Sequence, residues 1–272
     1  MKGDKNFTSG SLLLASSSIL AAATLAQREI VQFFRQRSRV VGAILPPILF
    51  WFLIGSGLSG SFQHQASLTS LQYFFPGTIV MIVLFTAIFS TISIIEDRKE
   101  GFLQSVLVAP IPRSSIALGK ISGGALIAFF QGMIFLLLAP ALGASLSPVR
   151  ILYGAVILLI VSFGLTGLGF LIAWGMESTQ GFHAVMNLFL MPMWFLSGAL
   201  FPVETAPRWL KALMMADPLT YSVTALQKAF YISDPAALSK FPSPEFSLLA
   251  TLAFSTLMFA ASVFVCARRE RP

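Results

Sequence analysis

Charged residues are scarce in this chain of 272 residues. Only 11% of the residues are Asp, Glu, Lys or Arg, whereas 56% are hydrophobic. The mean hydropathy is +0.82. A soluble domain carries about 25% charged residues, because water must solvate its surface. The shortage of charge therefore excludes an ordinary soluble enzyme and a disordered chain, and it favours the lipid bilayer as the environment of the protein.

Cysteine and histidine are almost absent, which excludes most disulfide and metal chemistry. Cys266 has no second cysteine to pair with, and His64 and His183 are predicted on opposite faces of the membrane. The chain contains no H-E-x-x-H, G-x-S-x-G or P-loop motif. We therefore expect no catalytic residue, no metal site and no cofactor on this chain.

Acidic residues are nearly absent from the apolar runs, which argues against self-sufficient proton coupling. Glu177 comes nearest, at the inner end of the fourth run. Any energy for active transport is therefore expected from another polypeptide. The net charge of +7 does not indicate nucleic acid as a partner, because Lys and Arg at the cytoplasmic edges of membrane spans account for it.

Six long apolar runs separated by short polar segments dominate the chain. Each is close to the ~20 residues that a helix needs to cross the hydrocarbon core. The runs are continuous rather than alternating with period two, so they predict helices and not strands. The predicted fold is an all-α integral membrane protein with six transmembrane helices, over residues 41–58, 75–95, 121–142, 151–176, 182–201 and 246–267.

Basic residues predict the orientation of these spans. Thirteen of the 18 Lys and Arg residues lie before the first span, between spans two and three, or after the last span. This asymmetry predicts a multi-pass protein of the inner (plasma) membrane with both termini in the cytoplasm. The predicted domains are a cytoplasmic segment at 1–40, a six-span domain at 41–267 and a basic tail at 268–272.

The N-terminal segment permits two interpretations. Residues 12–26 are apolar and follow Lys2 and Lys5, as in a signal peptide, or they lead uncleaved into a basic helix. A cleaved signal would place the following arginines outside, so the basic-inside bias favours the uncleaved form. Residues 27–40 have an amphipathic pattern that predicts an interfacial helix. The candidate functional residues of this helix are Arg28, Glu29, Phe33 and Arg35.

The segment after the second run has charges of both signs followed by an apolar stripe at helical spacing. Pro110 and Pro112 end this pattern. We interpret the segment as a short cytoplasmic helix that docks a soluble partner; the simpler alternative is a plain connector between spans. Its candidate contact residues are Glu96, Asp97, Arg98, Glu100, Gly101, Phe102, Leu103, Val106 and Leu107.

The segment after the fifth run predicts two short re-entrant or interfacial helices on the outer side, each beginning near a proline. Trp209 and Tyr221 suit the headgroup region. Pro192 lies within the fifth run and predicts a kink or break there. The segment is either a stabilising cap or a gate over an exit path, with Pro202, Trp209, Pro218 and Tyr221 as gate residues.

Several short fragments together resemble the permease subunits of ABC-2 type ATP-binding-cassette exporters, over roughly residues 27–267. Their order and spacing against the six spans carry the resemblance. The fragments are Tyr73-Phe74-Phe75-Pro76-Gly77, Glu96 to Leu103, Pro110-Ile111-Pro112-Arg113, Leu118-Gly119-Lys120, Ser197-Gly198, Phe201-Pro202, Pro207-Arg208-Trp209-Leu210 and Asp217-Pro218-Leu219-Thr220-Tyr221. Phe102 departs from the family, which often has Thr after the glycine.

The resemblance implies a dimer of six-span subunits driven by two separate ABC ATPase subunits, which would bind the ATP and Mg²⁺. It places a coupling helix at 100–108, a connecting helix at 27–40 and extracellular re-entrant helices at about 204–230. The expected activity is export of an amphipathic, lipid-linked, polysaccharide or drug-like substrate. An intramembrane lipid-modifying enzyme and a passive channel or scaffold remain as alternatives.

Overall fold

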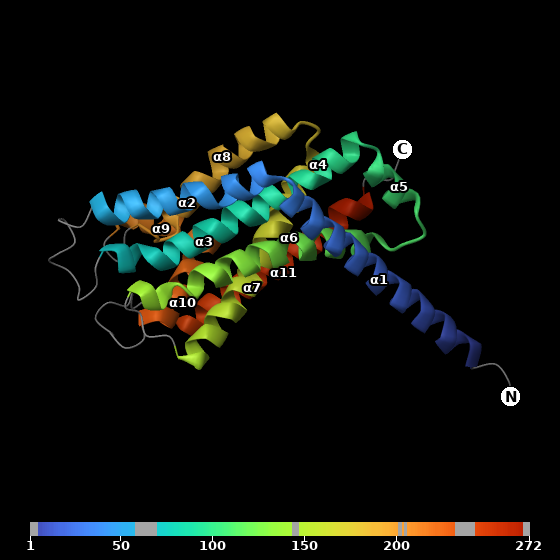
Figure 1. Ribbon diagram of the computed structural model, residues 1–272. Coiled ribbons are helices and arrows are strands. Elements are labelled where there is room, and N and C mark those ends of the chain that lie inside the picture. Colours follow the sequence, from blue (N-terminus) through green and yellow to red (C-terminus); the bar gives the residue numbers. More distant parts are fainter. Residues whose placement is uncertain are drawn as a thin grey trace.

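The computed structural model describes residues 5–57, 70–142, 147–200, 203, 206–231 and 243–268, and the regular elements among them are helices. Figure 1 shows their arrangement. The α-helices are α1 (Lys5–Arg35), α2 (Arg37–Gly57), α3 (Ser70–Ser90), α4 (Ile92–Lys99), α5 (Phe102–Val108), α6 (Arg113–Leu136), α7 (Pro148–Gly175), α8 (Thr179–Leu196), α9 (Arg208–Ala216), α10 (Pro218–Tyr231) and α11 (Pro244–Arg268), with a 3₁₀ turn η1 at Ala139–Leu142.

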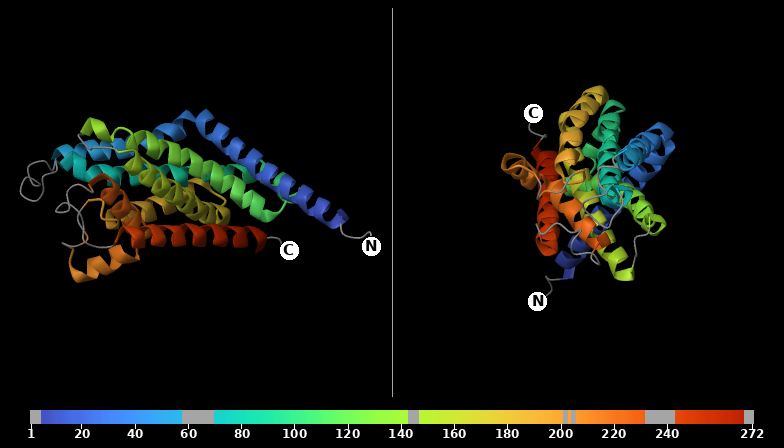
Figure 2. Two further views of the ribbon diagram at one scale, coloured as in Figure 1. Left: turned by 90° about the horizontal axis from the view of Figure 1, so that it is seen from below. Right: turned by 90° about the vertical axis from the view of Figure 1, so that its left-hand side faces the viewer.

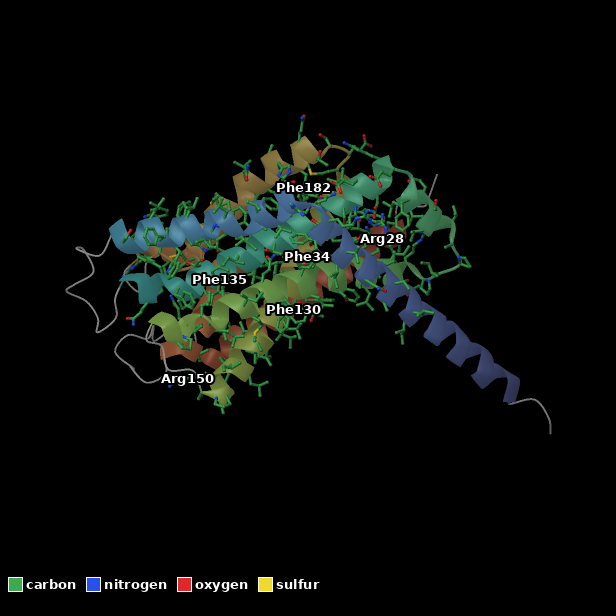
Figure 3. The ribbon with its side chains drawn as sticks, in the orientation of Figure 1. Arg28, Phe34, Phe130, Phe135, Arg150 and Phe182 are labelled. Carbon is green, nitrogen blue, oxygen red and sulfur yellow. The ribbon has the colours of Figure 1, made fainter. Side chains whose placement is uncertain are left out.

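The helices form an elongated bundle with two distinct ends. α5 and both ends of the chain lie at one end, and α9 lies at the other (Figures 1 and 2). Figure 3 places Arg28 at the α5 end and Arg150 at the far end. Within the described residues, the chain passes along the bundle through α2, α3 with α4, α6, α7, α8 and α11.

Five stretches of the described chain are long and apolar enough to cross a membrane. They are Arg37–Gly57, Gln72–Lys99, Arg113–Leu136, Pro148–Gly175 and Glu245–Arg268. The predicted fifth span corresponds to α8, which has 18 residues and is not among the five. Its first half carries Gln180, His183 and Asn187, which lower its hydropathy. α8 continues through Pro192, so the predicted break is not present.

α3 forms the centre of the bundle, and the outer helices turn apolar side chains outward. The side chains from Ile79 to Leu84 are fully buried, because α2, α6, α7 and α10 surround α3. By contrast, Phe52 on α2, Phe130 on α6 and Leu257 on α11 are each about 60% exposed. This distribution is the one expected of a bundle whose solvent is hydrocarbon rather than water.

α1 packs along α6 through glycines that allow a very close approach. A Cβ atom on Gly119 would lie 2.7 Å from the carbonyl oxygen of Ala22. A Cβ atom on Gly123 would lie 2.6 Å from Cβ of Glu29. Small residues at helix crossings let the backbones of membrane helices come together. The contact brings the buried face of α1 against α6.

Several boundaries differ from the sequence predictions. α1 is one helix of 31 residues that includes both the signal-like stretch and most of the predicted connecting helix. It meets α2 at a bend next to Gln36, so the first membrane-length helix begins at Arg37 rather than Val41. α4 extends to Lys99 after a turn at Thr91, so Glu96, Asp97 and Arg98 are helical residues rather than loop residues.

Candidate functional site

A sharp turn at Gly101 separates α4 from α5. Gly101 has a φ of +79°, in the left-handed region that glycine adopts without steric cost. The amide of Gly101 donates to the carbonyl oxygen of Arg98 at 3.3 Å. α5 ends at Val108, and the extended residue Ala109 leads to Pro110. The glycine and the proline thus define a short, separate helix at the end of the bundle.

One face of α5 is held against the bundle, and the other is exposed. Leu103 is buried, while Phe102, Val106 and Leu107 are half-buried and pack against the main core. The guanidinium of Arg28 lies 3.7 Å from the ring centre of Phe102. Val108 is 86% exposed. One face of α5 therefore anchors it to the bundle, and the opposite face is exposed.

A cluster of buried charges lies behind α5. Asp97 accepts two hydrogen bonds from the guanidinium of Arg28, at 2.6 and 2.8 Å. Lys120 on α6 contacts Asp97 and also donates to Oε1 of Glu29 at 2.6 Å. The hydroxyl of Ser93 donates to Oε2 of Glu29. We call Arg28, Glu29, Asp97 and Lys120 the charge cluster.

The charge cluster balances two carboxylates against two cations. Asp97 is fully buried, and Glu29 and Lys120 are each 4% exposed. Buried ions are costly to remove from water, and each carboxylate here is compensated by a cation and hydrogen bonds. The partners come from α1, α4 and α6, so the cluster joins three helices, of which α1 is distant in sequence from the other two.

The charges on either side of Asp97 attach α4 to two further helices. Arg39 on α2 donates to Oε1 of Glu96 at 2.7 Å. Arg98 donates to the carbonyl oxygens of Trp174 and Met176 at the end of α7, at 2.8 and 2.6 Å. The mixed-sign run Glu96-Asp97-Arg98 thus connects α4 to α1, α2, α6 and α7.

Most of the predicted coupling residues thus make contacts with other parts of the same chain. Glu96, Asp97 and Arg98 make intrachain contacts, whereas Glu100 is exposed. Of the predicted connecting-helix residues, Arg28 and Glu29 belong to the charge cluster, Phe33 is buried, and Arg35 is exposed.

Sequence reasoning did not identify Lys120 and Arg39 as site residues. Both are among the basic residues that indicate the orientation of the spans, and Lys120 also belongs to the fragment Leu118-Gly119-Lys120. Lys120 is separated from Glu29 by 91 residues and Arg39 from Glu96 by 57, so no local pattern connects either pair. The available signal was the position of Lys120 within the apolar helix α6, where a cation needs a partner.

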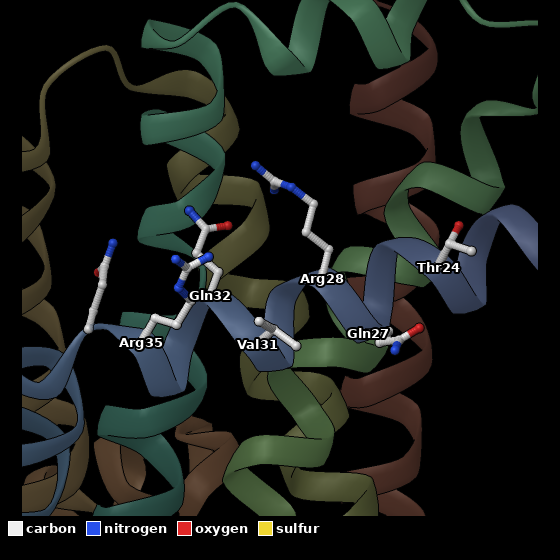
Figure 4. Close-up of a pocket in the computed structure, with 7 residues that line it drawn as sticks. Thr24, Gln27, Arg28, Val31, Gln32 and Arg35 are labelled. Atoms are coloured by element: carbon white, nitrogen blue, oxygen red, sulfur yellow. The ribbon is translucent and has the colours of Figure 1, made fainter.

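Two cavities lie near the charge cluster. A groove of about 530 Å³ runs along α1 and is shown in Figure 4, where Arg28 and Gln32 extend from the helix. A second cavity of about 380 Å³ lies between the start of α2, α4 and the start of α8, and includes Arg39, Glu96 and His183. Among the described residues, no cluster of three or more His, Cys, Asp or Glu residues is arranged to hold a metal ion.

The predicted gate residues lie at the opposite end, except Pro202, which is outside the described residues. Trp209 on α9 is 68% exposed, and Pro218 begins α10. The hydroxyl of Tyr221 donates to the carbonyl oxygen of Met215 at 2.7 Å. Burial raises the pKa of the neighbouring Asp217 carboxyl to about 7, although a hydrogen bond from the amide of Leu219 opposes the shift.

Comparison with known proteins places the chain among transport permeases. Residues 21–231 match the family described as ABC-2 type transporter. The putative transport permease ycf38 of Cyanophora paradoxa is 28% identical over 75% of this chain and 71% of its own length. Nodulation protein J of Sinorhizobium fredii is 24% identical over 70% and 73% of the two chains. The probable multidrug ABC transporter permease YbhR of Escherichia coli K12 is 30% identical over 58% of this chain and 43% of its own.

Proposed function

Since this chain belongs to the ABC-2 type transporter family, we propose that it is the permease subunit of an exporter whose separate ATPase subunits dock on α5. The family and the apolar helices make it a multi-pass membrane permease. The observation that carries the coupling proposal is the contact of α4, directly before α5, with four other helices through Glu96, Asp97 and Arg98.

The proposed mechanism is mechanical. ATP and Mg²⁺ bind on the ATPase, and movement of that subunit pushes on the exposed face of α5. Gly101 allows α5 to change its angle to α4, while the charge cluster keeps α4 attached to α1 and α6. Because buried ion pairs are costly to separate, these helices move together rather than slide past one another. Force on α5 therefore reaches the bundle as a movement of several helices.

The proposed topology has six membrane crossings with both ends of the chain on the cytoplasmic side of the inner membrane. Five membrane-length helices alone would leave the two ends on opposite sides, whereas the start of α1 and the end of α11 lie at the same end of the bundle (Figures 1 and 2). The passage of α8 along the bundle supports the sixth crossing. The cytoplasmic assignment of that end follows the distribution of Lys and Arg.

A second permease subunit, identical or related, is proposed to complete the transport path. The interface is proposed on α2, where the exposed apolar side chains of Phe52 and Leu53 would exchange lipid contacts for contacts with the second subunit. The path is proposed between the two subunits beside α2 and α8, with α9 and α10 as the outer gate. The proposed substrate is amphipathic, lipid-linked, polysaccharide or drug-like, and the similarity to the probable multidrug permease of E. coli supports the drug-like class.

The proposal is tested by changing the exposed face of α5. Val108→Asp is expected to weaken binding of the co-purifying ATPase about tenfold or more, because a charge replaces an apolar contact at the interface. Val149→Asp is the matched control, since Val149 is 76% exposed on α7 at the far end of the bundle. Co-purification and ATPase activity are measured for both variants. Equal ATPase binding by the two variants and the wild type would refute docking on α5.

A further inference from the structure

A large apolar groove lies between α7, α8 and α9, away from the charge cluster. Its volume is about 940 Å³, which is within the range of small-molecule sites. It follows α8 from Val185 to Leu196, a length of about 17 Å at the rise of an α-helix. α8 lies at the edge of the bundle (Figures 1 and 2). The lining includes Ile172, Met186, Phe189, Met193 and Leu213.

One acidic residue, Asp217, lies at the α9–α10 end of this groove. It lines the groove and is 6% exposed. Its Oδ1 atom accepts a hydrogen bond at 2.9 Å from the amide of Leu219, in the first turn of α10. Its Oδ2 atom is buried and has no hydrogen-bond partner in the part of the chain that the structure describes. The turn thus uses one carboxylate oxygen and leaves the other unpaired.

The chemistry of the lining selects the kind of ligand. A buried carboxylate oxygen without a donor is unfavourable, and a cation with an N–H group would relieve that cost. Among the described residues that line the groove, Asp217 is the only charged one and the rest are apolar side chains or Ala and Pro. A bare metal ion does not suit a single carboxylate among apolar side chains, because hard cations require several oxygen ligands.

We propose that this groove binds an amphiphilic organic cation, with its apolar body between α7 and α8 and its protonated amine paired with Oδ2 of Asp217. The site is a binding site in its own right and does not depend on ATPase docking at α5. The apolar walls supply affinity for the body of the ligand, and the carboxylate selects its charge. The protonated amine both donates a hydrogen bond and neutralises the buried acid.

The test measures binding of a fluorescently labelled long-chain alkylamine to the purified permease without ATPase, in zwitterionic lipid nanodiscs. The N-acetylated, neutral form of the same probe reports on charge selection. Asp217→Asn is the key variant, because the amide oxygen of Asn can still accept the bond from Leu219 while the charge is lost. Glu245→Gln is the control, since Glu245 is an exposed acid at the start of α11.

Asp217→Asn is expected to weaken alkylamine binding about tenfold or more, because a hydrogen bond to a charged group is lost. The neutral probe should bind the wild type and Asp217→Asn equally, and Glu245→Gln should bind the alkylamine as the wild type does. Equal alkylamine binding by the wild type and Asp217→Asn overturns the proposal. So does equal binding of the two probes to the wild type, which would indicate that lipid-like apolar ligands occupy the groove.

A second pair of variants tests the groove without changing Asp217. Leu213 lines the groove on the α9 side and is 49% exposed. Leu213→Trp places a larger side chain in the groove and is expected to reduce alkylamine binding at least fivefold. Leu249→Trp on α11 is the matched control, because Leu249 is 63% exposed and does not line the groove. This comparison decides the proposal if Asp217→Asn does not fold. Unchanged binding in Leu213→Trp also overturns it.

Discussion

Lys120 is the residue whose replacement tests the charge cluster most directly. Lys120→Met keeps the length of the side chain but removes its charge. Glu29 and Asp97 then remain buried with Arg28 as the sole cation, and Arg28 lies 3.8 Å from Glu29 compared with 2.6 Å for Lys120. Removing one partner of a buried ion pair costs about 3–5 kcal/mol, because it leaves an uncompensated charge. At roughly 2–4 °C per kcal/mol, the apparent unfolding midpoint should fall by on the order of 10 °C.

The assay is thermal unfolding of the purified protein in detergent, read from the accessibility of Cys266, which is buried in the folded protein. Lys99→Met is the control, because Lys99 is exposed at the end of α4. Adding Glu29→Gln to Lys120→Met should recover part of the loss, since it removes the uncompensated carboxylate and leaves Arg28 paired with Asp97. The reasoning is refuted if Lys120→Met unfolds at the same temperature as Lys99→Met, or if the double variant is less stable than Lys120→Met alone.

Two further predictions concern stability. Gly123→Ala should lower the free energy of unfolding by about 1–3 kcal/mol, because the new Cβ atom would lie 2.6 Å from Cβ of Glu29; Gly42→Ala, where nothing lies within 4 Å, is the control in the same unfolding assay. Asp217 should make stability depend on pH. Burial places its folded-state pKa at about 7, above the unfolded value of about 3.9, so its stabilising contribution is present below about pH 4 and is lost as the pH rises to 7. The unfolding midpoint of the wild type should therefore fall relative to Asp217→Asn between pH 4 and 7, and parallel curves for the two proteins would contradict this.

The helical architecture follows largely from local sequence. Apolar runs of membrane length form helices because a helix satisfies its own backbone hydrogen bonds in lipid. The position of α5 was also predictable, since Gly101 permits the turn before it and Pro110 prevents its continuation. Helix ends were less predictable: α4 and α6 both include charged residues that looked like loop residues, because their charges are paired within the bundle.

The directions in which the charges of α4 face were not predictable. The run Glu96 to Glu100 contains charges of both signs, and such a pattern suits a surface that pairs with a soluble partner as well as it suits pairing within the chain. In the structure, Asp97 is fully buried whereas Glu100 is exposed. The difference depends on where α1 and α6 lie, and their close contact at Gly119 and Gly123 depends on packing across about 90 residues of sequence.

The sequence alone determined that this is a helical membrane protein with a short helix between two of its spans, because composition, run length and the positions of Gly and Pro are local properties. Only the tertiary structure decided which charges meet. Lys120 compensates Glu29 and Asp97 because three helices cross at that point. Within the described part of the chain, Asp217 keeps an unpaired oxygen because the end of an apolar groove lies beside it. A charge in lipid must find a partner, but the identity of that partner depends on the packing of helices far apart in the chain.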